Sequence, residues 1–351
     1  MNYYKASKSY NMGVYIWLLA LTTMVLLIII IGGLTRLTDS GLSMTDWRPL
    51  LGVIPPLGQD KWLIVFEMYK QTPEFKIVNR SMTLEEFKFI FWWEWFHRVF
   101  ARLIGVVFII PLIYFLIKKQ VSKSLLLRLP IVFMFGIFQA FVGWWMVKSG
   151  LSENPYVSPY RLTFHLLNAL IIFSILLWIA MDYKHSLKTN FLSKPFSQDF
   201  LVFFSIVLVF ITIGTGGFMA GTNSGQSFNT FPLMNGKIIP DDYFLEDLGM
   251  YNIFENTVAI NFNHRWFSIF VFFYIIFVCF KFIKFDNKKV PKILVILVLF
   301  FLTLQVALGI VTLLSNVYLP LASMHQTNSI LLLSTLLISY HQFKYRKEYN
   351  E

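Results

Sequence analysis

The chain has 351 residues, of which 56% are hydrophobic and only 14% are charged, and its formal net charge is +11. A soluble domain of this length contains far fewer apolar residues, so the composition excludes an ordinary soluble enzyme and indicates an integral membrane protein. The location of the basic residues along the chain accounts for the positive charge, and nucleic-acid binding is a poor interpretation of it.

Apolar runs of about 20 residues recur along the chain, and each is long enough to cross a hydrocarbon layer about 30 Å thick. The expected fold class is therefore all-α, with eight transmembrane helices over residues 13–34, 91–117, 129–148, 161–181, 199–220, 259–280, 292–314 and 321–340. The single cysteine, Cys279, excludes an intramolecular disulfide and thiolate metal sites. Segment 35–90 is too long for a simple connector, so we expect an ordered outer lid with short helices.

Basic residues predict the orientation of the spans. They gather in the N-terminus, in three segments that follow alternate spans and in the C-terminal tail; the three segments are 118–128, 182–198 and 281–292. Because cytoplasmic segments carry such an excess of Lys and Arg, both termini are predicted to be cytoplasmic. Segment 221–257, with one Lys and five acidic residues, is predicted to lie outside.

The two halves of the chain resemble one another in four places. The similar pairs are IGGLTRLTDSG (31–41) and TGGFMAGTNSG (215–225), HRVF (97–100) and HRWF (264–267), QAFVG (139–143) and QVALG (305–309), and HLLN (165–168) and HQTN (325–328). Each half has an even number of spans, so the repeats are parallel and related by an axis along the membrane normal. We predict two pseudo-symmetric four-helix bundles, an N-terminal half 1–181 and a C-terminal half 199–351, joined by a cytoplasmic linker 182–198.

Histidines occur near the N-terminal end of every second span. Since alternate spans run in the same direction, they should lie at one depth near the outer face; they are His97, His165, His264 and His325. One such histidine could simply form a helix–helix hydrogen bond, but four in a duplicated pattern favour two bis-histidine haem sites within the bundles. Zinc fits less well because each half lacks four ligands. His185 and His341 lie in cytoplasmic segments and are expected to be solvated.

The halves differ beside these histidines. Glu94 lies three residues before His97, on the same helix face, whereas Asn261 occupies the equivalent position before His264. A carboxylate beside a porphyrin can move protons or stabilise a developing cation, and an amide cannot. The asymmetry predicts chemistry in the N-terminal half and electron handling in the C-terminal half. A salt bridge between Glu94 and Arg98 is the alternative role, and the two are compatible.

Four arginines near the outer ends of the spans are candidate partners of haem propionates: Arg98, Arg265, Arg36 and Arg161. Arginine pairs with carboxylates in a forked geometry. The alternative is that these side chains extend to the lipid headgroups.

Polar amides recur within the later spans of both halves. Gln139 and Gln305 are expected to serve helix packing, and Asn168 and Asn328 to form interhelical hydrogen bonds.

Over nearly its whole length the chain resembles the haem A synthase family. The most specific motifs are GGLTRLTDSGLSMTDW (32–47), EWFHRVFARLIG (94–105), the segment around His165, NHRWF (263–267) and MHQTN (324–328). The chain resembles the subclass without a cysteine pair in the first outer loop. The short N-terminus favours a protein of the bacterial cell inner membrane over an imported mitochondrial one.

The resemblance implies oxidation of a methyl group of haem O to a formyl group, which gives haem A for cytochrome oxidase, by successive hydroxylations. It implies that His264 and His325 ligate a haem b cofactor, that His97 and His165 are the ligands of the substrate haem, and that Glu94 is catalytic. Haem O synthase and cytochrome oxidase assembly factors are the implied partners, and a homo-oligomer is compatible with the sequence.

Two other functions remain open from the sequence. A dihaem b-type electron-transfer subunit would use the same histidines, although membrane-crossing electron carriers usually stack haems at two depths. A haem transporter would account for the repeats, but the spans show no obvious broken helix.

Overall fold

The computed structural model describes residues 10–46, 52–152, 154–185, 197–285 and 291–345. In these ranges eight helices exceed twenty residues: α1 (Met12–Leu37), α4 (Leu84–Ile117), α5 (Lys123–Gly150), α6 (Pro159–Lys184), α7 (Ser197–Gly221), α9 (Thr257–Phe285), α10 (Lys292–Leu314) and α11 (Leu319–Lys344). Each predicted span coincides with one of them. Most of these helices are longer than the apolar run that predicted them, because helices continue into polar residues beyond the hydrocarbon region.

Seven of the described helices, all of the long ones except α11, are long and apolar enough to cross a membrane. The protein is therefore an all-helical, multi-pass membrane protein. Helix α11 has 26 residues, as many as α1, but contains more polar side chains. Several of these polar side chains are buried against neighbouring helices, including Asn328 and Ser329.

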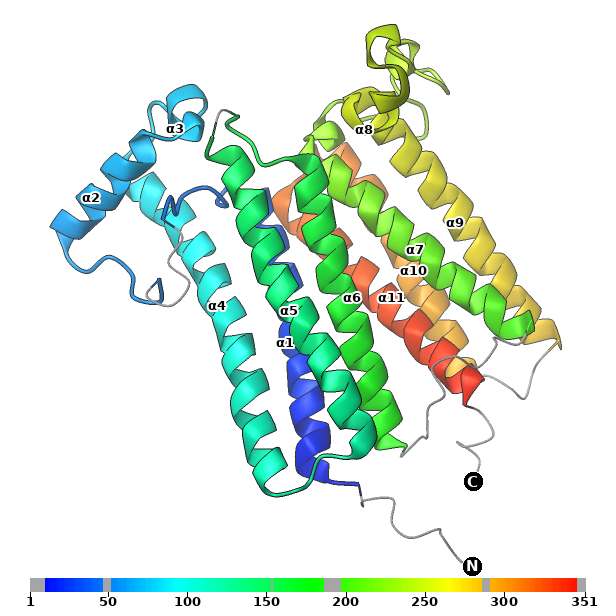
Figure 1. Ribbon diagram of the computed structural model, residues 1–351. Coiled ribbons are helices and arrows are strands. Elements are labelled where there is room, and N and C mark those ends of the chain that lie inside the picture. Colours follow the sequence, from blue (N-terminus) through cyan, green and yellow to red (C-terminus); the bar gives the residue numbers. More distant parts are fainter. Residues whose placement is uncertain (1–9, 47–51, 153, 186–196, 286–290, 346–351) are drawn as a thin grey trace, which may run out of the picture.

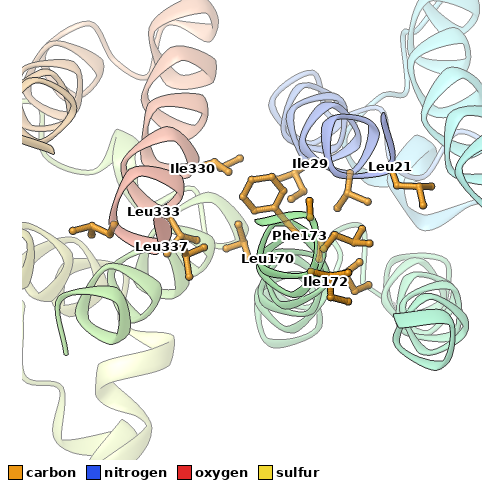
Figure 2. Close-up of a cluster of buried hydrophobic side chains, with 14 of the residues drawn as sticks. Leu21, Ile29, Leu170, Ile172, Phe173, Ile330, Leu333 and Leu337 are labelled. Carbon is orange, nitrogen blue, oxygen red and sulfur yellow. The ribbon is translucent and has the colours of Figure 1, made fainter. Parts of the chain in front are cut away.

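The long helices lie side by side, and α6 and α11 occupy the middle of the arrangement (Figure 1). Helix α6 packs against α1, α5 and α7, and α11 packs against α10, α7 and α1. Figure 2 shows Leu170 and Phe173 of α6 among apolar side chains of α1 and α11, including Ile29, Ile330 and Leu333. These side chains hold the two sets of helices together near the centre of the molecule.

The segment between α1 and α4, here called the lid, contains the short helices that the sequence predicted, α2 (Gln59–Lys70) and α3 (Pro73–Ile77). Residues 47–51 of this segment lie outside the described residues. Helix α4 starts two turns before its apolar run, where Thr83 and Glu86 form a capping box. The added turns carry Phe87, which packs with Trp62 and Phe66 of α2 and anchors the lid on α4.

The segment between α7 and α9 contains the short helices η1 (Ser224–Gln226), η2 (Asp241–Tyr243), η3 (Glu246–Tyr251) and α8 (Asn252–Glu255). Helix α1 begins and α11 ends at the end of the molecule opposite to the lid and to α8 (Figure 1).

The prediction that His341 is solvated is wrong. Its side chain is completely buried, and its Nε2 lies 2.9 Å from Oδ1 of Asp182 at the end of α6. The other oxygen of Asp182 accepts a hydrogen bond from Arg128 of α5 at 2.5 Å. Sequence position alone placed His341 in a tail, whereas α11 continues to Lys344 and turns this residue toward α6. His185, the C-cap of α6, is partly exposed.

Candidate functional site

One large cavity of about 1120 Å³ lies between the helices, and all four predicted histidines line it: His97, His165, His264 and His325. Pockets for small molecules have volumes of about 300–1,000 Å³, so this cavity lies just above the usual range and can hold a large ligand. The sequence predicted two sites, and the structure brings the residues of both to the wall of one continuous space.

Glycines lie against the histidine rings. A Cβ atom added to Gly143 of α5 would lie 2.9 Å from Cε1 of His165, and one added to Gly309 of α10 would lie 2.9 Å from Cε1 of His325. Real Cβ atoms do not approach other atoms so closely, so only glycine allows these rings their positions. The two halves therefore hold their second histidine in the same way.

Glutamines on the same helices contact these rings. Gln139 Nε2 lies 3.3 Å from His165 Nε2, and Asn168 fixes the amide by donating to Gln139 Oε1 at 2.6 Å. The C-terminal half repeats this arrangement: Gln305 Nε2 lies 3.2 Å from His325 Nδ1, and Asn328 donates to Gln305 Oε1 at 2.8 Å. The interhelical role of the two asparagines is confirmed. The glutamines do more than pack, because each also contacts an imidazole.

The first histidine of each half is held differently. Thr215 Oγ1 lies 2.7 Å from His264 Nδ1 and donates its own proton to the Thr212 carbonyl at 2.8 Å. With its proton on the Thr212 carbonyl, the hydroxyl would accept from the Nδ1–H tautomer of His264, in which Nε2 is available as a ligand. In the N-terminal repeat Ile31 occupies the position of Thr215, so His97 lacks this hydroxyl. The repeats already differ at this position in the sequence, but only the structure shows that Thr215 contacts the histidine.

Glu94 is buried, with 2% of its surface exposed, and also lines the cavity. Its Oε2 accepts hydrogen bonds from the Ser43 hydroxyl at 2.7 Å and from the Met44 backbone N–H at 2.8 Å. Its Oε1 accepts from Arg98 at 2.5 Å, the ion pair that the spacing predicted. Three donors hold the carboxylate where the loop after α1 meets α4.

In the C-terminal half an amide replaces this carboxylate. Asn261 donates to the Ser224 carbonyl at 2.6 Å and accepts from Arg265 Nε at 2.6 Å. Arg265 also donates to the carbonyls of Phe228 and Thr230, at 2.6 and 2.7 Å. Arg98 makes the corresponding bonds to loop carbonyls in the N-terminal half. Arg98 therefore ties the segment after α1 to α4, and Arg265 ties the segment after α7 to α9; both line the cavity.

The other two candidate arginines lie in different surroundings. Arg36 lines the cavity and joins the halves, since it donates to the Ala220 carbonyl at 2.7 Å and to Asn223 Oδ1 at 2.9 Å in the other half. Arg161 lies over the ring of Trp145, 4.4 Å from its centroid, and is not among the described residues that line the cavity.

A second carboxyl group, which sequence reasoning missed, reaches the cavity from the lid. Glu74 of α3 is 6% exposed and accepts a hydrogen bond from the Tyr69 hydroxyl at 2.9 Å. Burial raises the pKa of Glu74 to about 7. No local motif marks this residue, because it is brought to the cavity only by the packing of the lid on α4.

Comparison with known proteins identifies the family. The model of the family described as "Cytochrome oxidase assembly protein" (COX15-CtaA) matches residues 15–337. The chain belongs to this family. A protein named heme A synthase from Nitrosospira multiformis is 43% identical over 337 residues, which cover 94% of this chain and 93% of that protein. The heme A synthase of Nitrosomonas eutropha is 41% identical over 330 residues, covering 93% and 92% of the two chains.

The residues of the cavity fit a large, flat, mainly apolar ligand with a metal at its centre. Each half supplies two imidazoles, glycines leave room beside the rings, and buried His165 Nδ1 has no hydrogen-bond partner in the described part of the chain. Two imidazoles on opposite faces would complete the coordination of a haem iron. The cavity of this family member therefore has the donor set that two haem groups require.

Proposed function

We infer that this protein is a haem A synthase, a membrane oxidoreductase that converts haem O to haem A. The inference depends chiefly on relatives of that name, which are 39–43% identical over most of the chain. The cavity with its four histidines supports it independently. Haem O would come from haem O synthase, and cytochrome oxidase assembly factors would receive the product.

We propose that all eight long helices span the bilayer as two pseudo-symmetric four-helix bundles. The contacts support this arrangement, because α1 packs against α4 and α6 as α7 packs against α9 and α11. The contacts between the halves follow the same correspondence. Helix α6 packs on α7, and its counterpart α11 packs on α1, the counterpart of α7. We further propose that both termini are cytoplasmic, as the basic segments indicate, and that the histidines lie near the outer face of a bacterial inner membrane. A reporter that is active only in the periplasm should be inactive when it is fused to the C-terminus. Activity of this fusion would contradict the proposed orientation.

We propose that His264 and His325 hold a resident haem b, and that His97 and His165 bind the substrate haem. The observation that carries this division is the contact between Thr215 and His264, which would hold the ring of a permanent ligand in place. A substrate must leave after each turnover, and the N-terminal half lacks this hydroxyl. When bound, haem b supplies an iron centre that can exchange electrons.

We propose that Glu94 is catalytic and that its carboxylate acts on the substrate haem. Ser43, Met44 and Arg98 donate hydrogen bonds to this group and orient it at the wall of the proposed substrate half. From this position it could accept a proton from the substrate as the methyl carbon is oxidised, or stabilise positive charge that develops there. Arg36, Arg98 and Arg265 line the cavity and are the remaining candidates for pairing with propionates.

The activity is tested by extracting haem from cells that make haem O, with and without this protein. Haem that carries a formyl group should appear only with the protein. Its absence from both extracts would contradict the proposed activity. Glu94→Gln should retain resident haem b but produce little haem A, and a normal rate would exclude a catalytic role for the carboxylate.

The division of the halves is tested by the haemochrome spectra of two matched variants, purified in detergent. His264→Ala should lose haem b, and His97→Ala should keep it while losing turnover. The reverse result would exchange the roles of the halves.

A further inference from the structure

The N-terminal half of the cavity has an opening between α4 and α5. A Cβ atom added to Gly105 of α4 or to Gly136 of α5 would meet no other atom within 4 Å, and both glycines line the cavity. Helix α5 packs chiefly on α6, and α4 on α1 and α2. Below the two glycines, Phe108 and Phe133 stack at 5.8 Å and close the gap toward the other end of the helices.

The same position in the C-terminal half is filled. The HRVF and HRWF motifs align Gly105 with Phe272, and the glutamine motifs align Gly136 with Leu302. Leu302 is buried, with 3% of its surface exposed, and Phe272 packs against the central apolar cluster, whereas Gly136 is exposed. Helices α9 and α10 also pack directly against one another. The N-terminal half is therefore open between α4 and α5, whereas the equivalent position between α9 and α10 is closed.

The depth of the opening is informative. Gly105 follows His97 by eight residues and Gly136 precedes Gly143 by seven, so both glycines lie about 10–12 Å along their helices from the histidine level. The opening is thus continuous with the space beside His97 and His165, but displaced toward the middle of the bilayer.

A lateral opening at this depth suits one of the two porphyrins and not the other. Haem O carries a long isoprenoid chain, which haem b lacks, and withdrawing such a chain from the bilayer into water is costly. A pocket open toward the lipid lets the porphyrin enter while its chain stays in an apolar environment. A resident haem without the chain needs no such passage, in agreement with the closed C-terminal half.

We propose that the opening at Gly105 and Gly136 is the lateral entrance for the substrate haem and the subsite for its isoprenoid chain. The proposal rests on the proposed function, and it adds a residue-level basis for choosing between haems with and without the chain. The gap is supported by the cavity that both glycines line, and by the large apolar side chains Phe272 and Leu302 at the equivalent positions of the other half.

The first test substitutes Gly136 with the residue of the closed half. Gly136→Leu should raise the KM for haem O by roughly tenfold or more, with a smaller change in kcat, because the side chain occupies the chain's path. Resident haem b content should be unchanged. Ile131→Phe, which enlarges an exposed side chain of the same helix that is not among the cavity-lining residues, is the control and should behave as the wild type. An unchanged KM in a Gly136→Leu protein with normal haem b would overturn the proposal.

A labelling experiment tests the same subsite without blocking it. Gly136→Cys would be labelled in nanodiscs with an N-alkyl maleimide; the natural Cys279 is buried, and a Cys279→Ser background removes its contribution. Haem O should slow the labelling severalfold, and haem b added at the same concentration should not. Equal protection by both haems would overturn the chain subsite. Because labelling needs no turnover, it can support the subsite even if wild-type protein makes no haem A, a result that would refute only the proposed activity.

Discussion

The lid should loosen as the pH rises, because of one buried carboxyl group. Glu74 follows Pro73 in the first turn of α3, and only 6% of its surface is exposed. Tyr69 donates to Glu74 Oε2 at 2.9 Å, and Asn79 donates to the Tyr69 oxygen at 2.8 Å. These bonds join α2, α3 and the start of the following loop, so the protonation of Glu74 affects the whole lid.

Burial is the largest effect on this group and raises its pKa from 4.5 to about 7. The charges of Glu94 and Asp39 raise the pKa further, whereas the Tyr69 hydrogen bond and Arg36 lower it. Since the folded lid favours the protonated form, its contribution to stability is fully present below pH 4.5 and is lost as the pH rises through about 7. At 1.36 kcal/mol for each pKa unit, the loss is on the order of 3 kcal/mol.

Hydrogen exchange measures this local stability. Amides of residues 59–77 should exchange faster at about pH 8 than at about pH 5, after correction for the intrinsic rates, because the open lid is then more populated. Glu74→Gln should remove most of the difference, since the amide stays neutral at both values. Glu67→Gln is the matched control: Glu67 is an exposed lid glutamate paired with Lys70. A Glu74→Gln lid with the pH dependence of the wild type would refute this reasoning.

Four further substitutions test the contacts of the cavity and the buried ion pair. Gly309→Leu should displace the neighbouring His325 and abolish the haem b spectrum. Gly143→Leu should keep the haem b spectrum and lose turnover. Equal spectra in the two variants would contradict the proposed division of the halves. Thr215→Val should weaken haem b retention about 10–100-fold, measured by transfer to apomyoglobin, and unchanged retention would argue against a positioning role. Asp182→Asn should lower the free energy of unfolding by about 3 kcal/mol, because Arg128 and His341 lose their buried partner; an unchanged Tm would show that the cluster adds little.

Much of the architecture was predictable because its signals are local. Long apolar runs located the helices, and the repeated motifs identified pairs of equivalent residues in the two halves. The four histidines were predictable for the same reason, since an imidazole within an apolar segment is costly and therefore rare. The spacing of Glu94 and Arg98 predicted their ion pair, which depends only on the geometry of one helix.

Contacts between distant segments were not predictable in this way. The sequence placed His341 in a solvated tail, but α11 buries it against Asp182 of α6. The sequence treated Gln139 as a packing residue, but α5 directs its amide toward the ring of His165. The lid brings Glu74 to the cavity although no motif marks it.

The sequence by itself therefore determined the membrane class and the helices, and it singled out the four histidines that line the cavity. Only the tertiary structure decided that the four histidines line one cavity, that Thr215 contacts His264, and that Gly105 and Gly136 face open space. The physical reason is that periodicity and composition describe one segment at a time. Which faces of two helices meet, and where they leave a gap, depends on side chains that are far apart in the chain.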